Sequence, residues 1–80
     1  MIPIGTYMTS SDGLYHFQIM KHIIMDKFRF KGRGYECLVW DRELDRVRIM
    51  CFHEQSMMND KKMTKNEVQK FEERLGKEDE

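Results

Sequence analysis

The sequence predicts a mainly β protein of the α+β class, built as a small antiparallel barrel or curved sheet with one C-terminal helix. Three observations favour this fold. Up to about residue 55, apolar and polar residues alternate with the two-residue period of half-buried strands. Turn residues separate these stretches, and from residue 64 the period changes to that of an amphipathic helix. We therefore expect about four or five strands in a partly open, SH3-like or OB-like arrangement.

The first predicted hairpin covers residues 4–9 and 14–20. Asp12-Gly13 supplies its turn, because Gly13 can adopt the positive φ that tight hairpin loops require. Aromatic and aliphatic residues occupy every second position of its second strand, which is typical of a strand with one buried face.

The alternation slips after Met20. Ile23 and Ile24 stand side by side, so a strict two-residue period would place one of them on the wrong face. We expect a bulge or bend near Lys21-His22 to absorb the slip, as in small curved barrels.

A basic and aromatic stretch, KFRFKGRG, occupies residues 27–34. In its first five residues phenylalanines alternate with cations, which predicts a strand with one packed and one solvated face. The residues concerned are Lys27, Phe28, Arg29, Phe30 and Lys31. Gly32 and Gly34 interrupt the pattern, so we expect this strand to end there.

Residues 35–41 and 46–53 form the clearest predicted hairpin, joined by the acidic turn DRELD. Two registers fit the alternation. One pairs Val39 with Ile49 and thereby places the two cysteines opposite each other, and the other pairs Trp40 with Val47. A shift of one residue reverses the buried face, and the sequence leaves both registers open.

A helix is predicted over residues 65–75. Thr64 is its N-cap, and Glu67 completes a T-x-x-E capping box. One apolar stripe recurs at helical spacing, and it consists of Val68, Phe71 and Leu75. We expect Gly76 to end the helix in a left-handed conformation.

The 80 residues allow one domain, which we place at residues 1–76, followed by a frayed acidic tail at 77–80. Fourteen cations balance fourteen anions, which argues against a dedicated nucleic-acid binder. The chain lacks the roughly 20 consecutive apolar residues of a membrane span. With only two cysteines, Cys37 and Cys51, we expect a cytoplasmic protein with reduced thiols.

The sequence carries no motif of a catalytic or metal site. Three histidines and two cysteines have no ligand spacing, so we expect no metal and no cofactor. Asp41, Glu43 and Asp45 cluster in one turn, but a hairpin tip is open to water, where carboxylate pKa values stay near normal. We therefore expect turn formers and surface ion pairs rather than an enzyme.

Nine aromatic residues and eight methionines exceed what so thin a core can bury, and such a surplus favours a binding surface. We expect a protein-binding module that inhibits or redirects a larger cytosolic partner, and homo-oligomers are also possible. The alternative is a single-stranded DNA- or RNA-binding module that uses the basic-aromatic residues 27–35. The expected contact residues are Phe28, Arg29, Phe30, Lys31, Arg33, Tyr35, Trp40, Arg48, Met57 and Met58.

In size, methionine content and charge balance, the chain resembles the very small proteins encoded by phages, which bind and redirect host machinery. The resemblance lies in composition, without matched residues. It implies that the partner belongs to the machinery of a host cell.

Overall fold

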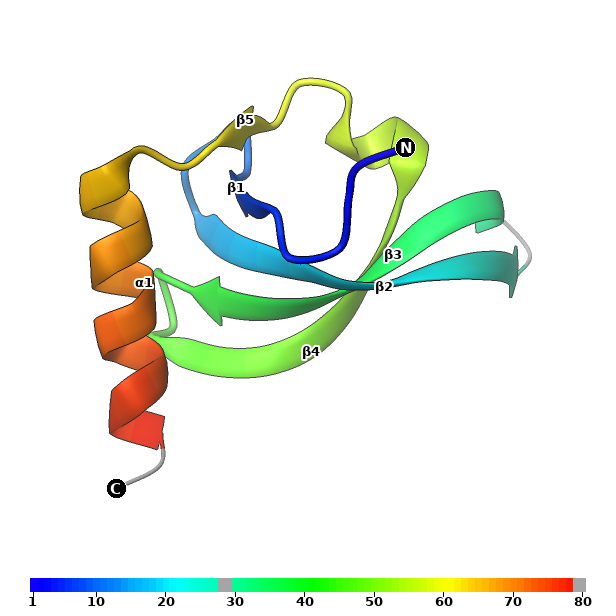
Figure 1. The fold of residues 1–80 in the computed structure, drawn as a ribbon. Coiled ribbons are helices and arrows are strands. Elements are labelled where there is room, and N and C mark those ends of the chain that lie inside the picture. Colours follow the sequence, from blue (N-terminus) through cyan, green and yellow to red (C-terminus); the bar gives the residue numbers. More distant parts are fainter. Residues whose placement is uncertain (28–29, 79–80) are drawn as a thin grey trace.

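The computed structural model describes residues 1–27 and 30–78, with the backbone alone for Lys27 and Phe30. Five antiparallel strands form one curved sheet in the order β4-β3-β2-β1-β5 (Figure 1). The strands are β1 (Tyr7–Thr9), β2 (Tyr15–Lys27), β3 (Phe30–Asp41), β4 (Arg46–His53) and β5 (Lys61–Lys62). The other elements are the 3-10 helix η1 (Glu54–Met57) and the helix α1 (Lys65–Glu78). In the described ranges β4 and β5 do not pair, so the sheet is open, and the predicted mainly β fold with one C-terminal helix is confirmed.

The first hairpin forms around Asp12-Gly13 as predicted, with Gly13 at a φ of 74°. The carboxylate of Asp12 accepts a hydrogen bond of 3.0 Å from the Leu14 N–H. Its first strand begins at residue 7 rather than residue 4, because a turn precedes it. In that turn the N–H of Thr6 donates to the Pro3 carbonyl at 3.3 Å, and Gly5 has a φ of 92°.

The predicted bulge is present, one residue before the predicted place. The pairing of β2 with β3 shifts between Ile19 and Lys21, so Met20 is the extra residue. Its side chain is exposed. Because of the extra residue, His22 and Ile24, rather than Lys21 and Ile23, share the face of Ile19. A bulge of this kind also bends the strand.

The stretch KFRFKGRG is not one strand, so that prediction is wrong. β2 ends at Lys27 and β3 begins at Phe30, and these two residues pair. Residues 24–27 and 30–33 pair only with each other, and they form a two-stranded arm that projects from the sheet (Figure 1). Phe28 and Arg29, and the predicted facing of the Phe30 side chain, lie outside what the structure describes.

Gly32 and Gly34 do not end β3, contrary to the prediction, because the strand continues to Asp41. Gly34 lies within the strand, where a Cβ would come within 2.8 Å of the Phe52 carbonyl oxygen and would also collide with the Met25 side chain. Glycine is therefore needed here for close approach within the sheet and not as a strand terminator.

The register of the β3–β4 hairpin is the one that pairs Trp40 with Val47, and the alternative pairing of Val39 with Ile49 is wrong. Cys37 faces Met50 across the ladder, and Cys51 faces Glu36. Because side chains alternate across a sheet, the two thiols lie on opposite faces and cannot form a disulfide in this fold.

The core lies on the concave face of the sheet. Its buried members are Met8, Phe17, Ile19, Tyr35, Cys37, Val39 and Met57. Trp40 lies on the other face, where it is half-buried, and its ring centroid is 5.6 Å from that of His16. A separate contact on this other face attaches α1, because Phe71 is fully buried with its ring edge-on to Tyr7.

The capping box of α1 is confirmed. The N–H of Thr64 donates to a Glu67 carboxylate oxygen at 2.8 Å, and the N–H of Glu67 donates to Thr64 Oγ1 at 3.2 Å. The predicted end at Gly76 is wrong, because the helix continues to Glu78 and Gly76 is not among the residues with positive φ. An ion pair of 2.6 Å from Arg74 to Glu78 spans this last turn. Residues 79–80 of the predicted tail lie beyond the described chain.

Replacement of Gly76 by alanine should therefore stabilise the protein, by roughly 0.5 kcal/mol, because alanine restricts the unfolded chain and favours helix. Nothing lies within 4 Å of the position of the added Cβ. Urea denaturation of G76A and wild type measures the difference. The matched control is G13A, which should destabilise because Gly13 has positive φ. A loss of stability in G76A would contradict the helical conformation at this residue.

Candidate functional site

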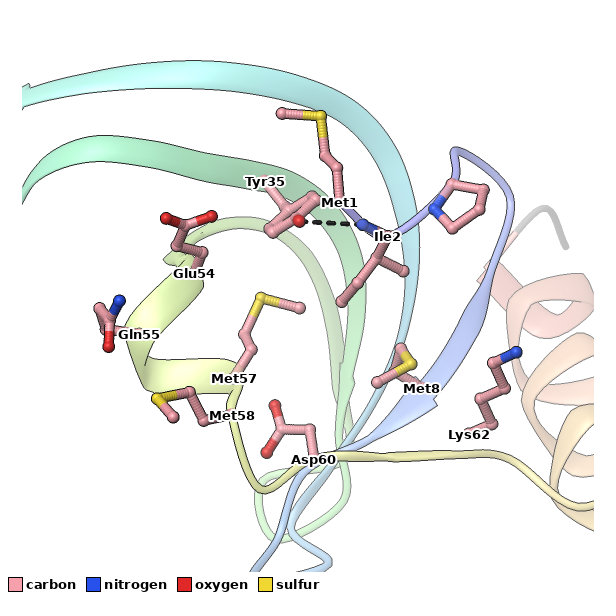
Figure 2. Close-up of a pocket in the computed structure, with 11 residues that line it drawn as sticks. Met1, Ile2, Met8, Tyr35, Glu54, Gln55, Met57, Met58, Asp60 and Lys62 are labelled. Carbon is pink, nitrogen blue, oxygen red and sulfur yellow. Dashed lines mark hydrogen bonds between the residues drawn. The ribbon is translucent and has the colours of Figure 1, made fainter.

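An open groove of about 590 Å³ lies between the N-terminal segment, β1 and the η1 region (Figure 2). Four of the eight methionines line it, namely Met1, Met8, Met57 and Met58. A volume of this size suits a few side chains of a bound molecule. Methionine is flexible and polarisable, and it is common on surfaces that adapt to their partners.

The floor of the groove is apolar and rigidly placed. Met8, Tyr35 and Met57 each expose 6% or less of their surface and belong to the main core. Met1 and Met58 form the rim, with 69% and 74% of their surface exposed. The groove therefore combines a fixed floor with two adaptable thioethers at its edge.

The N-terminal segment is held against the sheet by two hydrogen bonds at Ile2. The N–H of Ile2 donates to the Tyr35 hydroxyl at 3.0 Å, and the His22 Nε2–H donates to the Ile2 carbonyl at 2.6 Å. The rings of His22 and Tyr35 meet edge-on, with centroids 5.5 Å apart. Tyr35, which the sequence predicted as a contact residue, is thus buried and holds the N-terminal segment in place as one wall of the groove.

Polar residues surround the apolar floor. Glu54, Gln55, Asp60 and Lys62 line the groove from η1 to β5. The carboxylate of Asp60 accepts a hydrogen bond of 3.0 Å from the Ser11 N–H. Burial raises the pKa of Asp60, and repulsion from Asp12 adds to the shift. An apolar centre with a polar rim is the usual composition of a protein-binding surface.

Seven of the ten predicted contact residues have described side chains, and these lie in separate places, whereas Phe28, Arg29 and the side chain of Phe30 lie outside what the structure describes. Tyr35, Met57 and Met58 lie together in the groove. Lys31 and Arg33 are exposed on the arm, beyond the ladder with β4. Trp40 and Arg48 lie near the turn at 42–45 but on opposite faces of the sheet. Among the described side chains, the predicted contact residues therefore do not form one continuous surface.

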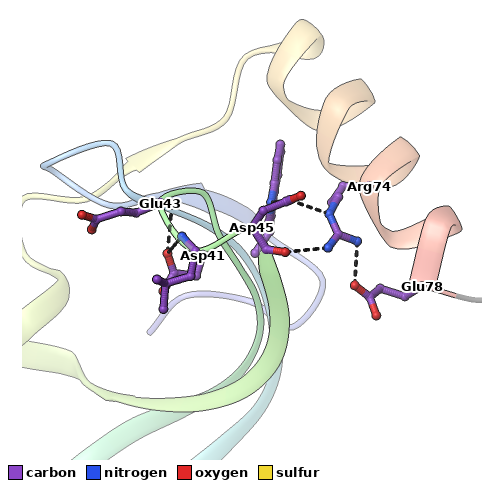
Figure 3. Close-up of polar contacts among 7 residues, drawn as sticks. Asp41, Glu43, Asp45, Arg74 and Glu78 are labelled. Carbon is purple, nitrogen blue, oxygen red and sulfur yellow. Dashed lines mark hydrogen bonds and ion pairs between the residues drawn. The ribbon is translucent and has the colours of Figure 1, made fainter.

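Asp41 and the acidic turn at 42–45 make hydrogen bonds that fix the turn and connect it to α1 (Figure 3). The buried Asp41 carboxylate accepts hydrogen bonds of 3.1 Å from the N–H groups of Glu43 and Leu44. Asp45 accepts from Trp40 Nε1 at 3.0 Å and from Arg74 Nε at 2.8 Å, which ties the turn to α1. The hydrogen bond from Arg74 is the main cause that lowers the pKa of Asp45.

Chemistry at the cysteines and histidines is limited by burial and separation. Among the residues that the structure describes, no three His, Cys, Asp or Glu side chains converge in a way that could hold a metal ion. Burial raises the pKa of Cys37 to about 12, so this thiol is a poor nucleophile. Cys51 is exposed on β4.

His16 is buried between Thr9 and Trp40, with Nδ1 at 2.9 Å from Thr9 Oγ1. Burial lowers its pKa, and the positive charge of Arg42 lowers it further. The folded state therefore binds fewer protons than the unfolded state near and below the ordinary histidine pKa of about 6.5. Stability is retained above that pH and is lost as the pH falls through it.

We expect the free energy of unfolding to decrease between pH 7 and pH 5.5, and this decrease should become smaller in H16N. Denaturant titrations of both proteins at several pH values measure it. The difference between the pH dependences of the two unfolding free energies gives the contribution of His16, because every other titrating group is common to both proteins. A steeper decrease in H16N would contradict a lowered pKa at this residue.

Sequence reasoning missed several residues of the groove, namely Met1, Ile2, Met8, Asp60 and Lys62. Met8 had a usable signal, since its alternation with Tyr7 and Thr9 places it on one face of a strand. The others had none, because their place depends on how the N-terminal segment and the connection after η1 meet across the sheet.

Comparisons with protein-family models, curated proteins and solved structures found no match to this chain. Within the described residues, α1 and η1 are too short and too polar to cross a membrane.

Proposed function

We propose that the protein is a non-enzymatic, cytosolic binding module that holds an apolar segment of a larger protein in the methionine-lined groove. The observation that carries the proposal is the groove itself, whose buried floor of Met8, Tyr35 and Met57 is bordered by exposed Met1 and Met58. Occupation of the groove would inhibit or redirect the partner. Because this chain resembles phage proteins in composition, we propose host machinery as the class of partner.

Met58 is expected to supply much of the affinity. Its side chain is exposed in the free protein, so a partner would bury most of its apolar surface. Full burial of an exposed methionine side chain contributes roughly 1.5–3 kcal/mol, and about 1.4 kcal/mol corresponds to a tenfold change in affinity.

Peptides that bind the wild-type protein, selected from a displayed random library, test this proposal. We expect M58D to weaken their binding at least tenfold, because an acid replaces an apolar contact. The matched control is I24D, which makes the same kind of change at a side chain 78% exposed on the arm and away from the groove. Both variants should keep wild-type stability within about 0.5 kcal/mol, since both side chains are exposed. Equal binding to M58D and wild type would refute the groove as the site.

A second candidate function is binding of single-stranded DNA or RNA by the arm. The observation that favours it is the projection of residues 24–27 and 30–33 as a two-stranded ribbon, with exposed Lys31 and Arg33 on one strand. Cations on a projecting ribbon can follow a phosphate backbone.

Fluorescence anisotropy with single-stranded oligonucleotides at several salt concentrations tests this alternative. Each phosphate contact contributes roughly 0.7 to the log–log salt slope, so K31Q/R33Q should reduce the slope by about 1.4. K65Q/K70Q removes the same charge from α1 and should leave the slope nearly unchanged. Absence of binding at low salt would exclude the arm as a nucleic-acid site.

A further inference from the structure

The two edges of the sheet differ in a way that matters for binding. β5 is two residues long and consists of two exposed lysines, which is how proteins block pairing at an edge. β4 is eight residues long, and its ladder with β3 runs from His53 to Arg46 without a bulge (Figure 1). Beyond that ladder, the backbone of residues 46–52 makes no hydrogen bond to any described residue. Such an edge offers a row of donors and acceptors to an added strand.

The side chains of β4 divide by face. Val47, Ile49 and Cys51 share one face, where Ile49 is 57% exposed. Arg46 and Arg48 lie at the N-terminal end of the other face, followed by Met50 and Phe52. The strand therefore presents alternating apolar and cationic positions, with partners along its inner edge only.

The two arginines are only partly neutralised. Arg48 lies 3.5 Å from the Asp41 carboxylate and keeps 47% of its side-chain surface exposed. Arg46 has no ion pair with any acid in the described ranges. An acidic side chain on an adjacent strand would lie directly opposite each guanidinium, which is a favourable cross-strand pair.

A hollow of about 270 Å³ adjoins the C-terminal half of β4. Met25, Met50 and Phe52 contribute its apolar walls, together with Cys51, His53 and Ser56. The hollow leaves room beside Cys51 for one side chain of an added strand. The kind of occupant follows from the free edge and from the two arginines.

We propose that β4 accepts a sixth, antiparallel strand from a partner protein, in which acidic residues alternate with apolar ones. Read from its N-terminus, the segment has the pattern apolar, any, apolar, acidic, apolar, acidic. The acidic positions lie opposite Arg48 and Arg46, and the apolar ones lie opposite Cys51, Ile49 and Val47. This surface is separate from the groove and does not depend on it.

Charge favours such a partner over a second copy of this chain. Pairing of β4 with itself would bring four arginines onto one face of the joined sheet, and β4 contains no acidic residue to neutralise them. An acidic strand from another protein would avoid this repulsion between arginines and would pair with them instead.

A charge exchange tests the proposal with two synthetic peptides, one containing VTIEVE and the other VTIKVK, within identical flanks. Wild type should bind the glutamate peptide at least tenfold more tightly than the lysine peptide. In R46E/R48E this preference should reverse, and in M58D it should remain. Hydrogen exchange should slow at the β4 amides that face away from β3. An unchanged preference in R46E/R48E, or protection confined to the groove, would overturn the proposal.

A second measurement needs no variant of the protein. N-methylation of alternate residues blocks one hydrogen-bonding edge of a peptide strand, so one of two such isomers of the glutamate peptide should keep its binding and the other should lose it. Equal binding of both isomers would overturn strand addition.

Sedimentation at micromolar concentration is the last check. A dimer that protects the same β4 amides from exchange would show that the added strand comes from a second copy of this chain and would overturn the proposed partner. Because M58D affects only the groove, failure here is distinguishable from failure of the proposed function.

Discussion

F71A should lower the free energy of unfolding by about 3 kcal/mol, the largest effect that we expect from a single substitution in α1. Truncation of a buried phenylalanine removes its transfer free energy and leaves a cavity. The Phe71 side chain is fully buried, and its ring lies edge-on to Tyr7 with centroids 5.9 Å apart. No other residue of α1 is buried. The attachment of the helix therefore depends on this side chain.

Helix content should fall with stability in F71A. An isolated helix of 14 residues is marginal in water, so α1 needs its contact with the sheet. Circular dichroism and denaturant titration measure both quantities. K70A changes an exposed neighbour on the same turn and should alter stability by no more than about 0.5 kcal/mol. A loss below 1 kcal/mol in F71A, with the helix retained, would mean that other contacts hold α1.

D41A should lower the free energy of unfolding by about 2 kcal/mol. Asp41 is 4% exposed, and its carboxylate accepts from the N–H groups of Glu43 and Leu44 within the turn. Alanine leaves these donors without their acceptor and deprives Arg48 of its nearest acid. Removal of one partner from a buried hydrogen bond costs roughly 1–3 kcal/mol.

D41N is the matched control for this substitution. Asparagine has the same shape, and its side-chain oxygen can still accept from the turn, so we expect it to lose less than half of what D41A loses. E43A, at an exposed position of the same turn, should be close to neutral. Equal losses in D41A and D41N would show that charge, rather than the turn hydrogen bonds, stabilises this end of the sheet.

Local patterns predicted most of the elements, because their signals lie within a few residues. The Asp12-Gly13 turn and the Thr64–Glu67 capping box form in the structure, and the bulge predicted near Lys21-His22 forms at Met20. The pattern failed in KFRFKGRG, where a single alternation fits equally well to one strand or to two strands of a hairpin. Glycine was also misread twice, since Gly34 provides close approach and Gly76 continues the helix.

The site was predicted less well than the fold. Methionine and aromatic enrichment identified Tyr35, Met57 and Met58 as part of a surface, and these three do line one groove. Enrichment carries no position in space, however, so Trp40, Arg48 and the arm residues were grouped with them although they lie elsewhere. The exposed edge of β4 could not be predicted, because the order of strands is not encoded in any one of them.

The sequence by itself determined where most strands and turns occur and where the helix begins, because backbone preference and two- or 3.6-residue periods act over short distances. Only the tertiary structure decided the β3–β4 register, the opposite facing of Cys37 and Cys51, and the meeting of Ile2, Tyr35 and Met57. These features depend on pairing and packing between segments far apart in the chain. There, a shift of one residue changes the buried face while the local pattern stays the same.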